Sequence, residues 1–432
     1  MVFPYVERPK GAHLDGAQHT DLGVAATTPP ASLWRNRDYL VLWCGQGVSN
    51  IGSQASALAL PLLMLALTGS PAQAGVLGGL RGLAYVLFGL PAGALADRWN
   101  RKRVLVVCDL GRAIAMASIP IAIVAGHLSA PQLYLVSFVE GTLFILFGLA
   151  ETACVTRVVP AAQLPAAIAQ NQASDATSTL VGPLIAGTLY SISRALPFVA
   201  DAVSYTFSVV SILFIRTRLQ ANRTRSERRL RTEIGEGVRW IWRRPVLRLL
   251  ISLNGGINII FGGWTLVLIQ LAQRQGANAA TIGLIFAGGG AGTVLGAVLA
   301  PVFQRRFTVN QIVIGVAWLF AITWPPPALA PNALTLGIVN AVGFFFVPIT
   351  SGTQLSYRLL LVPDALQGRV NSVFRLTGFG GGALGFLITG LLLQWYGPVA
   401  AVWITFVPAV ALALAPTLNR SLRGVGKIST VA

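Results

Sequence analysis

Blocks of about twenty apolar residues, repeated twelve times, are the feature that most limits how this sequence can fold. A helix of about 20 residues is long enough to cross the ~30 Å hydrocarbon layer of a bilayer. Because lipid offers no hydrogen bonds, each backbone polar group must be satisfied within its own segment, so the blocks are expected to be helices. Only 11% of the residues are charged, against about 25% in a soluble domain. The sequence therefore predicts an all-α membrane protein with twelve transmembrane helices.

The predicted spans form two groups of six, separated by a polar linker. They lie at residues 39–66, 72–96, 104–125, 132–154, 167–192, 195–216, 247–273, 279–303, 310–330, 332–356, 368–395 and 398–418. The expected organisation is a cytosolic N-terminal tail (1–33), an N-terminal half (34–216), a cytosolic linker with an amphipathic helix (217–246), a C-terminal half (247–418) and a cytosolic C-terminal tail (419–432).

The two halves are related by an internal repeat with a constant offset of 203 residues. The charged run at 93–103 has a weaker copy at 296–306, in which Ala300 stands where the first run has its acid. The same offset relates two pairs of glycines, Gly182 with Gly385 and Gly187 with Gly390. Each half has an even number of spans, so the repeat is parallel. Two such halves around a central substrate path are a common plan for secondary transporters.

Lys and Arg gather in the tails, in the linker and in alternate connections between spans, and they give a net charge of +18. Positive residues mark the cytoplasmic loops of membrane proteins, so both termini are predicted to be cytoplasmic. This topological role accounts for the charge and disfavours nucleic-acid binding. Within the linker, residues 233–244 mix Trp and Ile with Arg. They predict a surface helix with Trp and Ile facing lipid and Arg facing phosphates.

The run Gly93-x3-Asp97-Arg98-x2-Arg101-Lys102-Arg103 follows the second predicted span and resembles the signature loop of the major facilitator superfamily. Other stretches are similar to its branch of enterobactin exporters and macrolide efflux proteins, namely 42–46, 60–62, 67–71, 159–160, 182–183, 201–204, 362–364 and 367–370. The resemblance covers nearly all of residues 33–420. It implies the major facilitator fold, with two pseudo-symmetric six-helix halves, and a multi-pass protein of the cell membrane. We expect a monomer without a cofactor.

The charged hairpin predicts a latch between the halves. Asp97 lies at the cytoplasmic edge, where it can accept hydrogen bonds from the exposed N–H groups at the start of the eleventh span, near Gly368. Arg101 is expected to pair with Glu151, and the resemblance implies that the latch closes while the transporter faces outward. For the basic members, the alternative is that they only mark the membrane boundary. The predicted latch residues are Gly93, Asp97, Arg98, Arg101, Glu151, Gly368 and Arg369.

Carboxylates at membrane depth are the candidates for proton coupling, because no histidine lies within a predicted span. Each such charge costs about 2.5–3.5 kcal/mol on insertion, so each is suspected of a function. Glu140 is preferred because no partner lies near it in the sequence, although a structural or substrate-contact role stays open. Asp109 and Arg112 are three residues apart and are expected to neutralise each other. Arg81 and Arg375 are expected to join the latch or to snorkel. The four acidic candidates are Glu140, Asp175, Asp201 and Asp109.

A substrate cavity is predicted where polar side chains of the first and seventh spans face the bilayer midplane. Sparse polar groups in an apolar cleft suit a large amphipathic solute. The same side chains could instead hydrogen-bond between helices. The predicted cavity residues are Asn50, Gln54, Asn254 and Asn258, with Phe144 and Trp264 as apolar wall.

A helix kink is predicted at Gly182 and Pro183 in the fifth span, because proline removes a backbone donor. The stretch partly resembles the Gly-Pro motif of antiporters in the superfamily, but Ser and Ala replace some of its glycines. Ordinary tight packing of small residues is the alternative.

These features predict a secondary active exporter of a lipophilic or amphipathic small molecule, such as an antibiotic, a siderophore or another natural product, coupled to protons by antiport. The alternative is a lysophospholipid flippase of the same fold. An enzyme is disfavoured because the three cysteines are isolated and no nucleophile–base or metal-binding constellation stands out. An ATP-driven pump is disfavoured because the sequence lacks a phosphate-binding Gly-x4-Gly-Lys-Ser/Thr loop. The expected partners are the substrate, protons and the lipid bilayer.

Overall fold

The computed structural model describes residues 33–217, 219 and 230–419, without the side chains of 90–98, 230–234, 237, 364 and 365. These residues form helices and no strand. The N-terminal half contains η1 (Leu33–Arg35), α1 (Arg37–Thr68), α2 (Pro71–Arg98), α3 (Arg101–Val124), α4 (Ala130–Val158), η2 (Ala161–Gln163), α5 (Leu164–Ile192) and α6 (Leu196–Phe214). The linker contains α7 (Leu230–Trp242), and the C-terminal half contains α8 (Pro245–Gly262), α9 (Trp264–Arg274), α10 (Ala279–Arg306), α11 (Val309–Thr323), α12 (Pro326–Leu329), α13 (Ala333–Leu361) and α14 (Asp364–Leu418).

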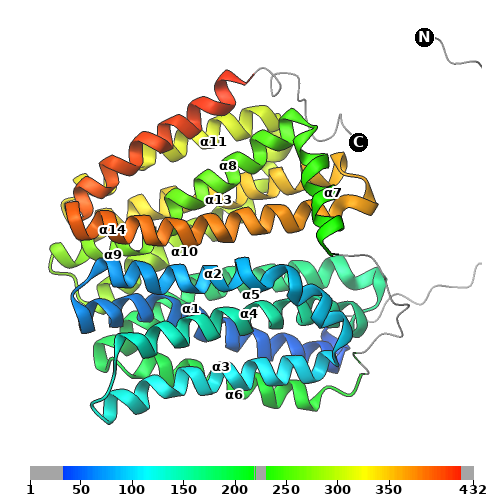
Figure 1. The fold of residues 1–432 in the computed structure, drawn as a ribbon, viewed down its shortest axis with the longest axis horizontal. Coiled ribbons are helices and arrows are strands. Elements are labelled where there is room, and N and C mark those ends of the chain that lie inside the picture. The colour runs from blue at the N-terminus through cyan, green and yellow to red at the C-terminus, as the bar shows by residue number, and fades with distance from the viewer. Residues whose placement is uncertain (1–32, 218, 220–229, 420–432) are drawn as a thin grey trace, which may run out of the picture.

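Nine segments of the described residues are long and apolar enough to cross a membrane, and the helices, which lie in two stacked halves, are compatible with the twelve predicted spans (Figure 1). Several spans of the C-terminal half differ in continuity from the prediction, including the ninth, which is divided between α11 and α12. The seventh is broken at Gly263 into α8 and α9. The eleventh and twelfth are both assigned to α14, which changes direction at Gly397, where φ is 75°. The positive φ at Gly397 is one that glycine adopts without the steric cost of a side chain. At Gly263, where φ is −91°, glycine instead allows close packing, because an added Cβ would lie 2.0 Å from the Cβ of Thr389.

The two ends of the bundle have different connections. All four positive-φ glycines of the described residues, Gly69, Gly126, Gly276 and Gly397, turn the chain at one end. We call this the neutral end, and the opposite end, where α2 finishes and α3 begins, the basic end. If the predicted topology is correct, the basic end is cytoplasmic.

Asparagine fixes where several helices begin. The side chains of Asn36, Asn100, Asn278 and Asn332 each accept a hydrogen bond from the backbone N–H three residues later, at the starts of α1, α3, α10 and α13. Such caps satisfy donors that have no partner within the helix. These local signals explain why the observed helix starts lie within a few residues of the predicted ones.

The two halves touch closely at two places, where α2 crosses α14 and α5 crosses α10. A Cβ added to Gly390 would lie 2.7 Å from the Cα of Gly75, and one added to Gly187 would lie 2.9 Å from the Cα of Gly283. Gly187 and Gly390 are the residues matched by the internal repeat. The repeat therefore places one glycine from each half at equivalent close contacts between the halves.

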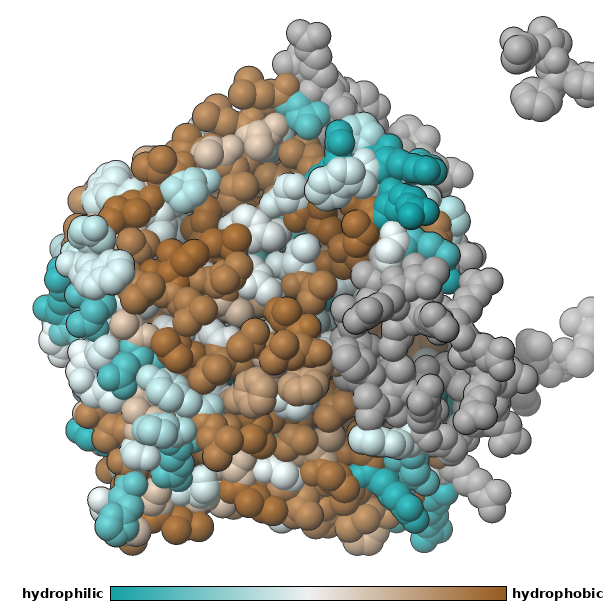
Figure 2. All heavy atoms as spheres, in the orientation of Figure 1, coloured by the Kyte–Doolittle hydropathy of each residue, from teal (hydrophilic) through white to brown (hydrophobic). Residues whose placement is uncertain are grey.

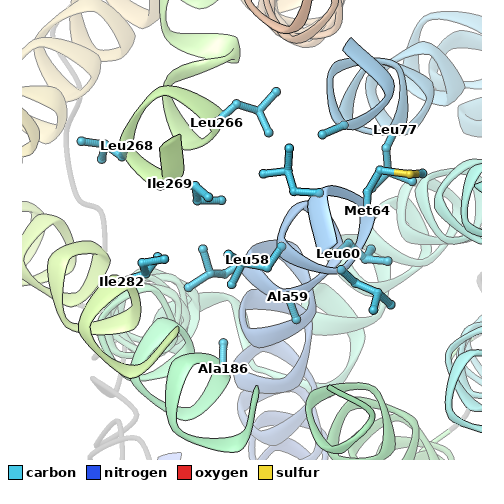
Figure 3. Packing of buried hydrophobic residues seen from close by; sticks show 14 of the residues in the cluster. Leu58, Ala59, Leu60, Met64, Leu77, Ala186, Leu266, Leu268, Ile269 and Ile282 are labelled. Carbon is cyan, nitrogen blue, oxygen red and sulfur yellow. The ribbon is translucent and has the colours of Figure 1, made fainter. Parts of the chain in front are cut away.

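An apolar cluster closes the space between the halves toward the neutral end (Figure 3). Leu58 and Met64 of α1 belong to the same buried cluster as Leu266 and Ile269 of α9, and Ile282 of α10 extends it. Because its members come from both halves, this cluster excludes water from the neutral end of the central path.

The outer surface is suited to lipid. Figure 2 shows apolar residues across the middle of one face and hydrophilic residues toward its two ends. Large apolar side chains such as Ile114 and Val298 are 64% and 69% exposed, which a bilayer would cover.

The linker helix α7 corrects one expectation. Trp242 is 64% exposed, but Ile241 is only 1% exposed and packs in a cluster with Leu247 and Leu250 of α8. The prediction that Ile241 faces lipid is wrong, because that side of α7 is covered by the C-terminal half.

Candidate functional site

A cavity of about 540 Å³ lies between the halves, bounded by α2 and α4 on one side and by α8, α13 and α14 on the other. Arg358 lies one turn before the end of α13, and Asn371 lies two turns after the start of α14, so the cavity reaches toward the basic end. Its lining residues are Gly78, Arg81, Gly82, Tyr85, Gly141, Phe144, Ile145, Asn254, Asn258, Arg358, Asn371, Phe374, Arg375, Gly378, Phe379, Gly382, Ala383 and Phe386.

The cavity lining contains arginines whose guanidinium groups lie near aromatic rings. The guanidinium carbon of Arg358 lies 4.0 Å from the ring centre of Phe374, and that of Arg375 lies 5.5 Å from the ring centre of Tyr85. Tyr85 also stacks on Phe379 across the halves, with ring centres 4.0 Å apart. Cations over ring faces are attracted by the quadrupole of the ring. The lining therefore combines positive charge with flat apolar surfaces.

Two predicted cavity asparagines, Asn254 and Asn258, line this space. The Asn254 amide donates to the carbonyl oxygen of Phe374 at 3.0 Å, and the Asn258 amide donates to that of Asn254 at 2.7 Å. The first bond fixes α8 against α14, the second lies within α8, and both leave the side-chain oxygens as acceptors. Phe144 also lines the cavity, as predicted, with the Arg81 guanidinium 5.7 Å from its ring centre.

The other predicted cavity residues lie elsewhere. Asn50 donates to Asp175 at 3.0 Å, and Gln54 donates to Thr179 at 2.9 Å, so both tie α1 to α5. Among the described residues neither lines the cavity. They follow the alternative, hydrogen bonding between helices.

Trp264 does not form the cavity wall. It is 6% exposed, and its indole N–H donates to Asn340 at 3.0 Å. It packs in an aromatic cluster with Phe261 and Trp324 inside the C-terminal half. The broken seventh span turns this ring away from the predicted position.

The predicted kink is a packing site in the structure. A Cβ at Gly182 would lie 2.4 Å from the Cβ of Gln54, so α5 approaches α1 closely there. Pro183 lies inside α5, and its carbonyl oxygen would be 2.4 Å from a Cβ added to Gly283. Small residues at these positions allow both approaches.

A buried charge network fills the middle of the N-terminal half. Arg112 lies 3.3 Å from Asp109 and 3.1 Å from Glu140, and Arg81 lies 2.8 Å from the second oxygen of Glu140. The Arg112 guanidinium also lies 4.1 Å from the ring centre of Tyr205. The predicted Asp109–Arg112 pair is confirmed.

Glu140 is therefore not the isolated carboxylate that the sequence suggested. It is 1% exposed and shared by two arginines from α2 and α3. Both partners are distant in the sequence, 59 and 28 residues away. Sequence proximity gave no sign of them.

Asp201 has a different environment. It is 0% exposed, and it accepts hydrogen bonds from Ser56 at 2.5 Å and from Ser204 at 3.3 Å. Among the described residues it has no ion pair. Asp109, in contrast, combines its arginine with a hydrogen bond of 2.5 Å from Ser208. Hydroxyl groups are thus the described partners of Asp201.

The predicted latch is only partly visible. Residues 90–98, which include Gly93, Asp97 and Arg98, are described without their side chains. The contact of Asp97 with the eleventh span therefore stays a prediction. Gly368 is exposed at the start of α14. Next to it, Arg369 pairs with Glu236 of the linker helix α7.

The hairpin residues Arg101 and Lys102 contact carbonyl oxygens of the N-terminal half and of the start of the linker. Arg101 donates to the carbonyl oxygens of Ala153 at 3.1 Å and Leu219 at 3.4 Å, and no ion pair with Glu151 is present among the described residues. Lys102 donates to the carbonyl oxygens of Leu213 and Ile215 at 3.0 and 2.8 Å, at the end of α6. Cations are stabilised at helix C-termini, where carbonyl groups lack partners. The expected Arg101–Glu151 pair is therefore replaced by carbonyl contacts.

The residues that sequence reasoning missed are on the C-terminal side of the cavity. Arg358 and Asn371 were not singled out, and Arg375 was assigned only to the latch or to snorkelling. One signal was present in the sequence. Between residues 247 and 418, Asp364 is the only carboxylate, so arginines in these spans have little opportunity for pairing.

Comparison with known proteins agrees with this architecture. Residues 42–386 match the family model of the Major Facilitator Superfamily. The multidrug efflux pump Tap of Mycobacterium tuberculosis is 26% identical over 390 residues, which cover 86% of this chain and 91% of that pump. Macrolide efflux protein A of Streptococcus pyogenes is 28% identical over 196 residues, covering 45% of this chain and 48% of that protein.

Solved structures show the same fold. The nucleoside transporter NupG superposes with a TM-score of 0.71 at 15% identity, covering 88% of this chain and 98% of that one. A bacterial homologue of the human lysosomal transporter Spinster, in an inward-facing and unoccupied conformation, gives a TM-score of 0.70 at 16% identity, covering 90% and 97%. At these identities the likeness concerns the fold alone.

Proposed function

The chain belongs to the Major Facilitator Superfamily, and on that premise we propose that it is a secondary active exporter of lipophilic or amphipathic small molecules that works by alternating access. It is a multi-pass membrane transporter and not an enzyme. The observation that carries the proposal is the position of the cavity. It lies between two halves that are sealed at the neutral end, and it extends toward the basic end. With the basic end in the cytoplasm, this arrangement admits substrate from the cell interior.

The relatives support a drug-like substrate. Both Tap and macrolide efflux protein A are named for the export of drugs. A volume of about 540 Å³ lies within the range of about 300–1,000 Å³ that is usual for small-molecule sites. Aromatic walls with a few polar groups suit a rigid amphipathic compound better than a sugar.

The buried network supports proton coupling. Among the residues whose side chains are described, the carboxylates of Asp109, Glu140 and Asp201 lie near only two guanidinium groups, those of Arg81 and Arg112. A buried charge without a partner is costly, so the network is neutral only when one carboxylate carries a proton. The two arginines hold Asp109 and Glu140, whereas hydroxyl groups hold Asp201. We therefore assign the exchangeable proton to Asp201.

The proposal is tested with the purified full-length protein in proteoliposomes that carry a pH gradient. We expect the uptake of ethidium or fluorescein to depend on the gradient and to stop when a protonophore is added. Asp201→Asn should lose gradient-driven uptake but keep exchange of dye at equilibrium, because its side chain is neutral in every state. Asp201→Glu, which still carries a proton, should keep part of the driven uptake.

Two results would contradict these assignments separately. Full gradient-driven uptake by Asp201→Asn would remove Asp201 from coupling. Absence of dye movement by the unmodified protein, with and without a gradient, would count against an exporter of such compounds. The second candidate, a lysophospholipid flippase, is favoured by the arginines of the cavity, which suit a phosphate group. It predicts transfer of a labelled lysolipid between leaflets without a pH gradient.

A further inference from the structure

The arginines of the two halves differ in how their charge is balanced. In the N-terminal half, Arg81 and Arg112 share Glu140, and Arg112 also contacts Asp109. In the C-terminal half, neither Arg358 nor Arg375 forms an ion pair among the described residues. The C-terminal half also offers almost no acid, because Asp364 is its only carboxylate. Two positive charges therefore line the cavity without a counter-ion from their own half.

Aromatic stacking explains how these charges are held but does not use up their hydrogen-bonding capacity. Phe374 lies beneath the Arg358 guanidinium at 4.0 Å, whereas the Arg375 guanidinium lies 5.5 Å from the ring centre of Tyr85 and also hydrogen-bonds the Tyr85 side chain. Stacking engages the face of the guanidinium group, whereas its N–H donors point outward in its plane. The buried Nε of Arg358 has no hydrogen-bond partner. This atom is buried in the wall and does not itself reach the cavity, so the charge and the remaining N–H donors of Arg358 are the groups that meet a ligand.

The rest of the lining determines what else the ligand must carry. Among the described residues, Glu140 lies behind Arg81, and no carboxylate lines the cavity. A cationic ligand would thus face positive charge without compensation. The rings of Phe144, Phe379 and Phe386 offer flat apolar surfaces to the remainder of the ligand.

We propose that the cavity binds an amphipathic anion, whose carboxylate, sulfonate or phosphate group is held by Arg358 and Arg375 and whose apolar body lies against the aromatic rings. This inference rests on the proposed function, since it names the substrate class of the same site. Guanidinium groups bind such oxyanions through two parallel hydrogen bonds. The shared chemistry is the acidic group, which a drug-like acid or an anionic lysolipid could supply.

The test compares two dyes that share a xanthene ring but carry opposite charge. Full-length protein in phosphatidylcholine nanodiscs is titrated with fluorescein, an anion, and with rhodamine 123, a cation, and binding is followed by fluorescence anisotropy. We expect fluorescein to bind at least about tenfold more tightly. Arg358→Gln and Arg375→Gln should each weaken fluorescein binding by about 10-fold or more, as expected for loss of a charge-assisted hydrogen bond.

Controls separate charge from folding. Arg306→Gln removes an exposed arginine at the basic end of α10, outside the cavity, and should leave the affinity unchanged. Arg358→Lys and Arg375→Lys keep the charge but lose the planar donor pair, and they should keep the preference for fluorescein with a smaller loss of affinity. These variants answer the question even if a glutamine variant fails to fold.

Competition identifies the source of the anion. Displacement of fluorescein by cholate favours a small amphipathic acid, and displacement by lysophosphatidylglycerol but not by lysophosphatidylcholine favours a lipid headgroup. Tighter binding of rhodamine 123, or an unchanged affinity for fluorescein in both glutamine variants, would overturn the proposal. Because binding needs no gradient, this outcome is distinct from failure of the exporter assay. Ethidium export without fluorescein binding would support the proposed exporter function but contradict the proposal that the cavity binds an amphipathic anion.

Discussion

The two halves of the molecule share a helical plan but treat charge in opposite ways. The N-terminal half buries Asp109, Arg112, Glu140 and Asp201 away from solvent, in a network of ion pairs and hydroxyl contacts. The C-terminal half replaces this network with an aromatic cluster around Trp264 and Trp324.

The comparison shows that the two repeats share equivalent glycine contacts between the halves but differ in the chemistry of their buried side chains. Gly187 and Gly390 occupy matching positions and make matching close contacts between the halves. The buried charged residues Asp109, Arg112, Glu140 and Asp201, in contrast, have no charged counterpart at the offset of 203 residues. We infer a division of roles in which the N-terminal half carries the proton and the C-terminal half supplies the unpaired charge that meets the ligand.

The largest expected effect comes from breaking the charge network at Glu140. Glu140→Gln leaves two arginines without their shared counter-ion, and removal of one partner from a buried pair costs about 3–5 kcal/mol. The thermal unfolding midpoint of the detergent-purified protein should fall clearly. Glu151→Gln, on the same helix but without an ion pair among the described residues, should shift it little. Equal midpoints for the two variants would show that the network does not stabilise this half.

The next effect concerns the contacts that the halves share. A side chain at Gly187 would meet the carbonyl oxygen of Ala279 at 2.5 Å, and one at Gly390 would meet that of Pro71 at 2.8 Å. Because backbone atoms cannot move aside easily, Gly187→Val and Gly390→Val should hold the neutral end open and abolish dye transport. Labelling of Leu268→Cys by a membrane-impermeant maleimide should then increase in a background that lacks the native cysteines.

The control for Gly187→Val and Gly390→Val is Gly315→Val in α11, where an added Cβ meets nothing within 4 Å. It should insert and transport normally. If Gly187→Val and Gly390→Val both transported dye at the normal rate, transport would not require the two halves to pack as closely at the neutral end as they do in this structure.

A third prediction contrasts the charged hairpin at 93–103 with its copy at 296–306. Asp97→Asn should abolish export and leave membrane insertion intact, because the latch depends on a negative charge at the N-terminus of α14 and the amide lacks this charge. Arg305→Gln in the copy, where the acid is absent, should leave export near normal. Export in inverted vesicles and protein level in the membrane measure the two properties. Unchanged export by Asp97→Asn would rule out the latch.

The smallest effect is expected inside the aromatic cluster. Trp264→Phe keeps an aromatic ring but leaves the buried side-chain oxygen of Asn340 without its donor, which should cost about 1–3 kcal/mol. The unfolding midpoint should fall slightly, and fluorescein affinity should stay unchanged because Trp264 lies outside the cavity lining among the described residues. Trp395→Phe, at a ring that is 69% exposed, is the matched control. A large loss of fluorescein affinity in Trp264→Phe would return this residue to the substrate site.

The sequence was sufficient for properties set locally. Apolar length defines the spans, and asparagine caps define their starts, so the boundaries agree within a few residues. The repeat register also held, because Gly187 and Gly390 are equivalent in space. Polar faces were harder to interpret. Asn254 lines the cavity and Asn50 bonds to a neighbouring helix, although both looked alike as polar residues near the middle of a span.

The partners of Glu140 could not be foreseen because they lie on two other helices. Their meeting depends on how α2 and α3 pack on α4, which no local pattern records. The same limit applied to Arg358, whose role follows from the rings beneath it and from the lack of acids around it. The sequence therefore predicted which segments form helices, but it did not predict which side chains meet when those helices pack together.

The glycine contacts at the neutral end also determine how far the opposite end can travel. A helix of 28 residues such as α2 is about 42 Å long at about 1.5 Å per residue. If the halves rotate by about 10° around contacts near one end, the far end moves by about 7 Å over that length. In the alternating-access mechanism proposed above, the glycine contacts would therefore be the fulcrum, and a small rotation about them would produce a large movement at the mouth of the cavity.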